Sequence, residues 1–326
     1  MKKDNLTFPS LKGVRVLFLG TYPPPFGGIA AHLKALMPAL IKAGTDDITV
    51  LSFGAKNEVE AVDGITVYRV NLKRNLWQIL LPQYLLLTWK VLVILGFKGR
   101  LSFRFLIREV VKAIITAKIV SKHRSNVVSS YMANASLQLL PLNQYWAGKK
   151  GVVLTVFGEV YEAPEFMEKY KELINELLSF PDFVLSSSRH CANSFKMIGN
   201  ERRIEPVFYG VELTDVTSQE KRDGFRKKYG IKNDEVLVFF MGRMLRDMGL
   251  DVVLDTAESL LASAPGVRIV LAGATGDLSS QAHALAKQHP DRVFTFENVS
   301  FQEQRELYSA ADILVAPSFN QRACMG

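Results

Sequence analysis

The chain alternates short apolar runs with longer segments in which apolar residues recur at helical spacing. Over residues 29–43, for example, positions 33, 36, 37, 40 and 41 form one apolar face of a helix. The short runs are rich in β-branched residues and bounded by turn residues, which is typical of buried strands. These predicted strands cover residues 15–20, 48–53, 65–70, 126–131, 152–157 and 183–188. Strands that alternate with helices predict a parallel sheet.

A polar and charged stretch at residues 212–233 interrupts this pattern, which then starts again. The second series predicts strands at 236–242, 267–273, 293–298 and 313–318 and helices near 249–263, 280–288 and 302–310. A chain of 326 residues is also longer than one hydrophobic core usually supports. We therefore expect two α/β domains, 1–212 and 213–326. Because the sequence stops soon after a predicted strand, we expect the second domain to be truncated.

Composition adds a cellular compartment to this picture. The apolar fraction of 48% and the aromatic fraction of 10% describe a globular protein. Its two cysteines, Cys191 and Cys324, form no metal or redox motif, and this indicates a reducing compartment. The apolar run at 14–19 is too short for the core of a signal peptide. We predict a cytoplasmic protein.

An apolar segment at residues 76–97 contains a single charge, Lys90. Its length would allow a membrane span. Pro82 interrupts it, however, and strands of one predicted sheet lie on both sides, so a crossing would divide one domain across the bilayer. We expect an interfacial or buried helix pair instead.

A basic segment follows, with eight Lys or Arg between Lys98 and Arg124 against the single acid Glu109, a net charge of +7. The basic positions 100, 104, 108 and 112 are four residues apart, and apolar positions 103, 107, 110 and 114 lie on another face. This pattern predicts a basic amphipathic helix within an insert at about 74–124, which would attach the protein peripherally to an anionic membrane surface. The alternative is an ordinary surface helix with solvated charges. Nucleic acid is not expected, because no recognised nucleic-acid fold or stacking aromatic residues accompany the charge.

The loop after the first predicted strand, GTYPPPFGGIAAH, places Gly27 and Gly28 at the start of a helix. Adjacent glycines allow close approach of a ligand, and a helix N-terminus favours a phosphate. A tight strand-to-helix turn explains the same residues equally well. His32 lies one turn further on and could orient a phosphate or an acceptor hydroxyl, although packing or capping is the commoner role for a lone histidine there.

Two arginines, Arg243 and Arg246, follow the carboxyl end of the first predicted strand of the second series. Parallel sheets bind ligands at that edge. A guanidinium can bind a diphosphate and stabilise the charge that develops on it as a leaving group. Solvated surface arginines are the alternative. No GxGxxG loop after the first strand, Walker motif or DxD pair occurs, so neither nicotinamide, P-loop chemistry nor a metal is predicted.

These motifs, taken in order, resemble family 4 of the glycosyltransferases. The resemblance implies a GT-B-like α/β fold, with two Rossmann-like domains whose parallel sheets face a cleft. It also implies transfer of a sugar, with retention of configuration, from a UDP- or GDP-type nucleotide sugar to a lipid-linked or glycan acceptor, as in cell-envelope or polysaccharide synthesis. No other cofactor is implied. The matching segments are GG (27–28), FYGVE (208–212), GR (242–243), GLD (249–251), LAG (271–273) and ELYSAADILVAPS (306–318).

The resemblance also assigns roles to particular residues. Arg243 and Arg246 would act on the diphosphate as the catalytic pair, and Val299 and its neighbours would lie near the base. The full donor-binding set would be Gly27, Gly28, Gly210, Arg243, Arg246, Gly273, Asn298, Val299 and Ser318. On the acceptor side we expect His32, Phe157 and Glu159. A solvated loop acid is the alternative for Glu159.

Three positions depart from the family pattern. Met248 replaces the usual lysine five residues after the arginine of GR, and Phe157 stands where a histidine is frequent. Gln321 occupies roughly the position of the first glutamate of a pair. These departures leave open a non-catalytic GT-B-like binding or scaffold protein, or another GT-B activity such as a nucleotide-sugar epimerase.

Overall fold

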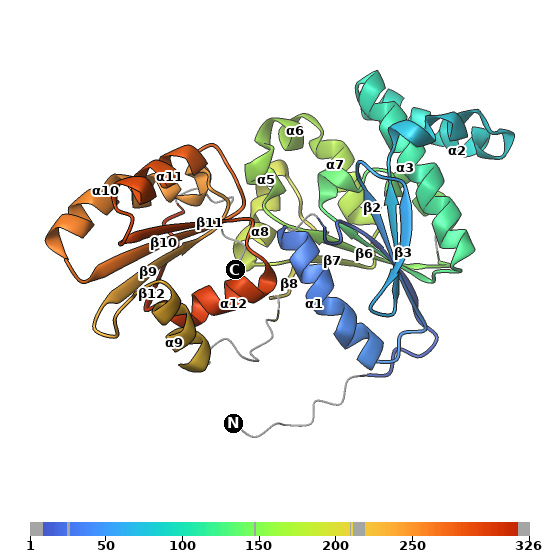
Figure 1. Cartoon of the computed structure of the whole chain (residues 1–326). Helices are drawn as coiled ribbons and strands as arrows, with labels where there is room; N and C mark the ends of the chain where they lie inside the picture. The colour runs from blue at the N-terminus through green and yellow to red at the C-terminus, as the bar shows by residue number, and fades with distance from the viewer. Residues whose placement is uncertain (1–8, 25–26, 147, 209, 211–218, 319–326) are drawn as a thin grey trace. The chain divides into compact units, whose positions relative to one another are not determined.

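A computed structural model describes residues 9–24, 27–146, 148–208, 210 and 219–318 (Figure 1). The chain divides into two compact units, with the division between residues 211 and 212. Each unit is an α/β unit with its own sheet and its own hydrophobic clusters.

The first unit contains an eight-stranded sheet in the order β3-β4-β2-β1-β5-β6-β7-β8. Every neighbouring pair is parallel except β3 and β4, which pair antiparallel at one edge. The six predicted strands are present, whereas β3 and β8 were not predicted. The strands are β1 (Arg15–Leu19), β2 (Asp47–Phe53), β3 (Glu58–Val62), β4 (Ile65–Val70), β5 (Val127–Tyr131), β6 (Gly151–Val156), β7 (Phe183–Ser186) and β8 (Glu205–Pro206).

Helices cover both faces of this sheet, as the side chains of β1 show. Leu17 and Leu19 belong to one buried cluster, and Val16 and Phe18 belong to another. The helical elements in chain order are α1 (Gly28–Lys42), η1 (Lys73–Leu80), η2 (Pro82–Tyr84), α2 (Leu85–Val91), η3 (Leu92–Lys98), α3 (Phe103–Lys122), η4 (Ala133–Ala135), α4 (Leu139–Trp146), α5 (Glu159–Glu162), α6 (Pro164–Lys169), α7 (Lys171–Ser179), α8 (Arg189–Ser194) and η5 (Phe195–Ile198).

The predicted basic helix is α3, and it is chiefly a core helix. Most of its residues from Leu106 to Val120 are buried. The prediction that Lys112 faces an anionic surface is wrong. Lys112 is buried, and its Nζ lies 2.7 Å from Oε1 of the buried Glu109. Phe103, expected on the apolar face, is 74% exposed. Arg104 and Arg108 remain exposed.

The apolar segment before α3 forms a bent helix pair. In the described ranges no single helix is long and apolar enough to cross a membrane. The segments Lys73–Leu80 and Pro82–Phe97 reach that hydropathy only together, and they are bent by 89° at the break between them.

The second unit contains a four-stranded parallel sheet in the order β11-β10-β9-β12. All four strands and the three helices after β9 were predicted; α9, in the polar stretch, was not. The elements are α9 (Gln219–Lys228), β9 (Val236–Met241), η6 (Arg246–Met248), α10 (Leu250–Ser263), β10 (Val267–Gly273), α11 (Ser279–Gln288), β11 (Val293–Glu297), α12 (Phe301–Ala310) and β12 (Ile313–Val315).

Asp312, the acid of the AAD motif, joins three elements of the second unit. Its Oδ2 accepts a hydrogen bond from the backbone N–H of Leu237, near the amino end of β9, at 2.7 Å. Its two oxygens also lie 2.5 Å from Arg222 and 3.1 Å from Arg226, both on α9. Burial raises the pKa of Asp312, but these hydrogen bonds outweigh it and hold the pKa below the ordinary value.

Candidate functional site

At the carboxyl edge of the second sheet, the loops after three strands are in backbone contact at two glycines. Gly273, at the end of β10, has φ +147°, and a Cβ there would lie 1.6 Å from the carbonyl oxygen of Gly242, after β9. A Cβ on Gly249 would lie 2.4 Å from the carbonyl oxygen of Pro317, after β12. Because backbone touches backbone at both positions, only glycine fits. The loops after three neighbouring strands are therefore held together at the edge where α/β sheets bind ligands.

Both predicted phosphate-binding arginines lie in the loop after β9. Arg243 follows Gly242 directly and is exposed. Arg246 begins η6, its side chain is 76% exposed, and its Nε lies 3.8 Å from Oδ2 of Asp251. At this exposure the ion pair contributes little to stability. Both guanidiniums are accessible to an anionic ligand.

Met248 lies at the same strand end as these arginines. Its terminal methyl carbon is 3.2 Å from the position that a Cβ on Gly242 would occupy. The departure from the family pattern therefore falls on a side chain that reaches the β9 loop, where a lysine would add a third cation.

The predicted base-side residues follow β11. Asn298 adopts a left-handed conformation, φ +53°, and its backbone N–H donates to the carbonyl oxygen of Gly273 at 2.7 Å. Its side-chain amide donates to Oγ1 of Thr275 at 3.0 Å. Val299 is half-buried against the cluster beneath the sheet. The structure thus places Asn298 directly beside Gly273.

The remaining donor candidates are less closely placed. The backbone nitrogen of Ser318 is 2.8 Å from the Cβ position of Gly249, so Ser318 belongs to the same edge. Gly210 is exposed and lies in the first unit. Gln321, where a family glutamate was expected, lies outside the described residues.

In the first unit, Gly27 and Gly28 begin α1 as predicted. Gly27 is extended, at φ −179°, and a Cβ there would meet nothing within 4 Å, so neither strain nor crowding requires glycine at this position. Gly27 offers no side-chain cap to the 15-residue helix. The first-turn N–H groups and their dipole point toward the proline loop before them.

Arg69, on β4, organises that proline loop and was not singled out from the sequence. It is 9% exposed and uses every N–H group of its guanidinium. Nε and one Nη donate to Oε1 of Glu60 on β3, at 3.0 and 2.6 Å. The remaining hydrogen bonds reach the carbonyl oxygens of Tyr22, Pro23 and Pro24 at 2.7–2.8 Å. The sequence signal that could have identified Arg69 is its position as a charged residue inside the apolar run ITVYRV.

The acceptor-side candidates His32 and Phe157 both contact Tyr131, at the end of β5. The ring centroid of Tyr131 is 5.8 Å from that of His32 and 6.2 Å from that of Phe157. Burial lowers the pKa of His32 and raises that of Tyr131, so both rings are neutral near pH 7. Phe157 is buried and His32 is half-buried, which leaves the histidine as the more accessible of the two.

Glu159 is fully buried, so the interpretation as a solvated loop acid is wrong. Its Oε1 accepts the backbone N–H of Ala133 at 2.8 Å, and its Oε2 accepts that of Phe157 at 2.5 Å. These hydrogen bonds tie the loop after β5 to the loop after β6. Met132, next to Ala133, has φ +70°, a conformation that costs a non-glycine residue free energy. Burial raises the pKa of Glu159 to about 7, although hydrogen bonds from three backbone N–H groups, its own and those of Ala133 and Phe157, act in the opposite direction.

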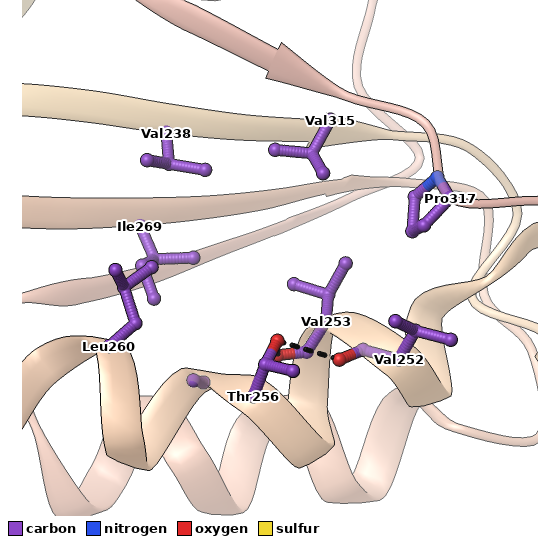
Figure 2. A pocket seen from close by; sticks show the side chains of 9 residues that line it. Val238, Val252, Val253, Thr256, Leu260, Ile269, Val315 and Pro317 are labelled. Carbon is purple, nitrogen blue, oxygen red and sulfur yellow. Dashed lines mark hydrogen bonds between the residues drawn. The ribbon is translucent and has the colours of Figure 1, made fainter.

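A cavity of about 100 Å³ lies in the second unit between α10 and the sheet, and Pro317 of the carboxyl edge is part of its lining (Figure 2). Its lining is apolar except for Thr256, whose hydroxyl donates to the carbonyl oxygen of Val252 at 2.7 Å. A charged ligand would find no partner there. Within the described ranges, no group of three or more His, Cys, Asp or Glu side chains is arranged to hold a metal ion.

Comparison with known proteins agrees with the sugar-transferring assignment. Residues 221–325 match the family model described as glycosyl transferases group 1. The chain is 24% identical over 315 residues to an uncharacterized glycosyltransferase, MJ1607, of Methanocaldococcus jannaschii, covering 91% of this chain and 72% of that protein. It is 32% identical over 125 residues to the D-inositol 3-phosphate glycosyltransferase of Mycolicibacterium smegmatis, covering 36% of this chain and 28% of that protein. These similarities support the predicted enzyme class, a glycosyltransferase.

Two solved structures are similar to the chain as a whole. Anabaena HepE in complex with UDP has a TM-score of 0.61 at 17% identity, covering 94% of this chain and 74% of that chain. Sucrose-phosphate synthase from Thermosynechococcus elongatus has a TM-score of 0.65 at 15% identity, covering 94% and 76%. The GT-B-like α/β fold is thereby confirmed.

Proposed function

We propose that the chain acts as a retaining glycosyltransferase of family 4 type, whose second unit binds a nucleoside diphosphate sugar and whose first unit presents a lipid-linked or glycan acceptor. The observation that carries the proposal is the convergence of the loops after β9, β10 and β12, with Arg243 exposed beside Gly242. This edge combines close backbone approach with an accessible guanidinium, and a diphosphate requires both.

The reaction breaks the bond between the anomeric carbon and the diphosphate oxygen, and forms a bond from that carbon to an acceptor hydroxyl oxygen. The electron pair of the broken bond passes to the diphosphate oxygen, and the proton of the acceptor hydroxyl is transferred to the departing diphosphate. Arg243 neutralises the charge that develops on the leaving group, and Arg246 adds a second cation. Asn298, held beside Gly273, and Val299, the next residue, border the space for the base.

UDP is the first nucleotide to test. Anabaena HepE has been solved with UDP and with UDP and glucose, and an Escherichia coli protein of similar fold was solved with UDP-2-fluoro glucose. GDP is the second choice, and no metal is required in the proposed reaction.

We further propose a cytoplasmic enzyme attached peripherally to the inner face of a membrane. The net charge of +7 between Lys98 and Arg124 supports attraction to anionic lipid, which contributes about 1 kcal/mol per basic residue near the surface. The acceptor would then be met at the membrane, as in synthesis of cell-envelope lipids or polysaccharides.

Calorimetric titration with UDP, comparing the wild type with Arg243→Ala, tests the donor site. A charge-assisted hydrogen bond contributes about 1.5–3 kcal/mol, so the substitution should weaken UDP binding about tenfold to a hundredfold. Lys227→Ala, at an exposed cation on α9, is the matched control and should leave the affinity unchanged. Equal affinity of the wild type and Arg243→Ala would refute the assigned role.

Turnover separates this proposal from its alternatives. Release of UDP or GDP from donor sugars, with the anomeric configuration of the product determined by NMR, supports a retaining transferase. Binding of nucleotide without any turnover would favour a non-catalytic GT-B-like protein, the reading that the replacement of lysine by Met248 supports.

A further inference from the structure

Exposed apolar side chains concentrate in a short stretch of the first unit. Of the large apolar residues that are exposed in the described part of the chain, eight lie between residues 76 and 103. We call this set the apolar tip. It comprises Leu76, Trp77, Leu80, Leu85, Leu86, Trp89, Phe97 and Phe103, each between 42% and 80% exposed.

The elements that carry the apolar tip are η1, α2, η3 and the first residue of α3. α2 and α3 lie side by side in the first unit, and both contact η1 and η3 (Figure 1). Their inward residues, such as Leu87, Val91 and Leu95, are already buried in the core. On α2 and η3 the exposed positions Leu85, Leu86, Trp89 and Phe97, which a helix of a soluble domain normally fills with polar residues, are apolar as well. These two helices are therefore apolar on both faces, and folding of the first unit covers one face of each.

Charge in the same stretch is of one sign. From residue 64 to residue 108 the sequence contains no Asp or Glu, and the next acid, Glu109, is buried and paired with Lys112. Exposed cations accompany the apolar tip at Lys73, Arg74, Arg100, Arg104 and Arg108. An apolar surface with cations and no anions matches the boundary of an anionic bilayer, with acyl chains beneath acidic headgroups.

Two further features favour lipid. Trp77 and Trp89 are 59% and 60% exposed, and tryptophan is the residue most characteristic of the membrane interface. A shallow groove of about 220 Å³, lined by Leu86, Trp89, Lys90, Val93, Ile94 and Gln144, opens beside the apolar tip. Its apolar walls and single cation suit part of an acyl chain.

A crossing of the bilayer does not fit this geometry. The strands β4 and β5, which flank the segment, belong to one sheet, and the bent pair turns by 89°. The arrangement allows shallow insertion, because two arms that meet at this angle can both lie in the surface plane.

We propose that the apolar tip inserts into the headgroup layer of an anionic membrane, so that apolar insertion, and not charge alone, holds the protein there. This deepens the peripheral attachment proposed above and rests on it for the class of partner, but it is independent of sugar transfer. It also replaces the row of basic residues on α3 as the main contact, because Lys112 of that row is buried.

Vesicle sedimentation of the whole chain tests the proposal, using phosphatidylcholine vesicles with and without phosphatidylglycerol. We expect binding to the anionic vesicles, part of which persists at high salt, because screening removes only the electrostatic contribution. Tryptophan emission should shift to the blue and be quenched by brominated acyl chains. The third tryptophan, Trp146, is buried and provides a constant background.

Variants separate insertion from charge. Leu80→Ser combined with Leu86→Ser should reduce partitioning about tenfold or more and abolish the fraction that resists salt. Arg104→Glu combined with Arg108→Glu should reduce binding about thirtyfold or more at low salt, because two cations are lost and two anions are added, and some of the remaining binding should still resist high salt. Met197→Ser, at an apolar side chain 67% exposed on η5, is the matched control and should bind as the wild type does. Circular dichroism confirms that each variant is folded.

Several results would overturn the proposal. These are absence of wild-type binding to anionic vesicles, complete loss of binding at high salt, or equal losses for Met197→Ser and the leucine variant. Resistance to alkaline carbonate extraction would indicate a span instead. A dimer in light scattering that Leu80→Ser and Leu86→Ser dissociate, without vesicle binding, would make a second copy of the chain the partner. UDP titration is unaffected by any of these outcomes, so a failure here is distinct from a failure of the donor site.

Discussion

Glu159 provides the sharpest test of the first unit, because its charge is predicted to oppose folding at neutral pH. The side chain is fully buried, and its two oxygens accept the backbone N–H groups of Ala133 and Phe157. The substitution Glu159→Gln removes the ionisation while keeping one accepting oxygen. Its amide nitrogen would face a backbone donor, so the variant loses one of the two hydrogen bonds.

The sign of the pH effect follows from the direction of the pKa shift. Burial raises the pKa of Glu159 from its ordinary value of 4.5 to about 7 in the folded protein. The folded state therefore binds the proton more tightly than the unfolded state, and the free energy of unfolding falls as the pH rises from about 4.5 to about 7. A shift of this size corresponds to about 3 kcal/mol, at 1.36 kcal/mol per unit.

Urea unfolding at a series of pH values between 4.5 and 7.5 measures this effect. Glu159→Gln should be less stable than the wild type at the acidic end by about 1–3 kcal/mol, because a buried hydrogen bond is lost. That gap should narrow or reverse by pH 7.5. Glu165→Gln, at an exposed glutamate on α6, should show no such trend. A gap that stays constant with pH would refute the raised pKa.

Two further substitutions test the loops that form the candidate site. Arg69→Lys replaces five donating N–H groups by three, so we expect the free energy of unfolding in urea to fall by about 2–4 kcal/mol, partly because Glu60 loses its partner. Arg74→Lys, at an exposed arginine, is the control. Equal losses of stability for the two variants would contradict the role of Arg69 in holding the proline loop. Gly273→Ala should cost more than about 3 kcal/mol, because its Cβ would overlap backbone at 1.6 Å. Gly266→Ala, whose Cβ would meet nothing within 4 Å, should be tolerated, and similar stabilities of the two alanine variants would disprove the crowding.

Elements with buried side chains were predicted from the sequence, whereas exposed or polar elements were missed. Central parallel strands such as β1 and β10 are covered on both faces, so their sequences are continuous apolar runs that stand out from the chain. β3 was missed because it is an antiparallel edge strand with mostly exposed side chains. α9 was missed because it is polar, and it is fixed by the long-range pairing of its arginines with Asp312.

The candidate site was predictable where a residue carries its own signal. Arg243 and Gly273 directly follow apolar runs, so their position at the carboxyl edge could be inferred from the sequence. The partners of Gly249 and Gly273 could not, because contact with Pro317 and Gly242 depends on the register of separate strands. Glu159 was identified as a candidate but its burial was not, since the two N–H groups that bind it come from different loops.

The acid of AAD, in the segment 306–318 that resembles family 4, lies on the opposite edge of the second sheet from the proposed chemistry. Asp312 binds the N–H of Leu237, near the amino end of β9, whereas Arg243 follows the carboxyl end of the same strand. Its other partners, Arg222 and Arg226, come from α9. Asp312 therefore holds the second unit together from the amino edge of the sheet, away from the carboxyl edge where the donor is proposed to bind. A chain could keep this signature unchanged after losing activity, so its presence supports the fold, and the donor site must be tested at Arg243 itself.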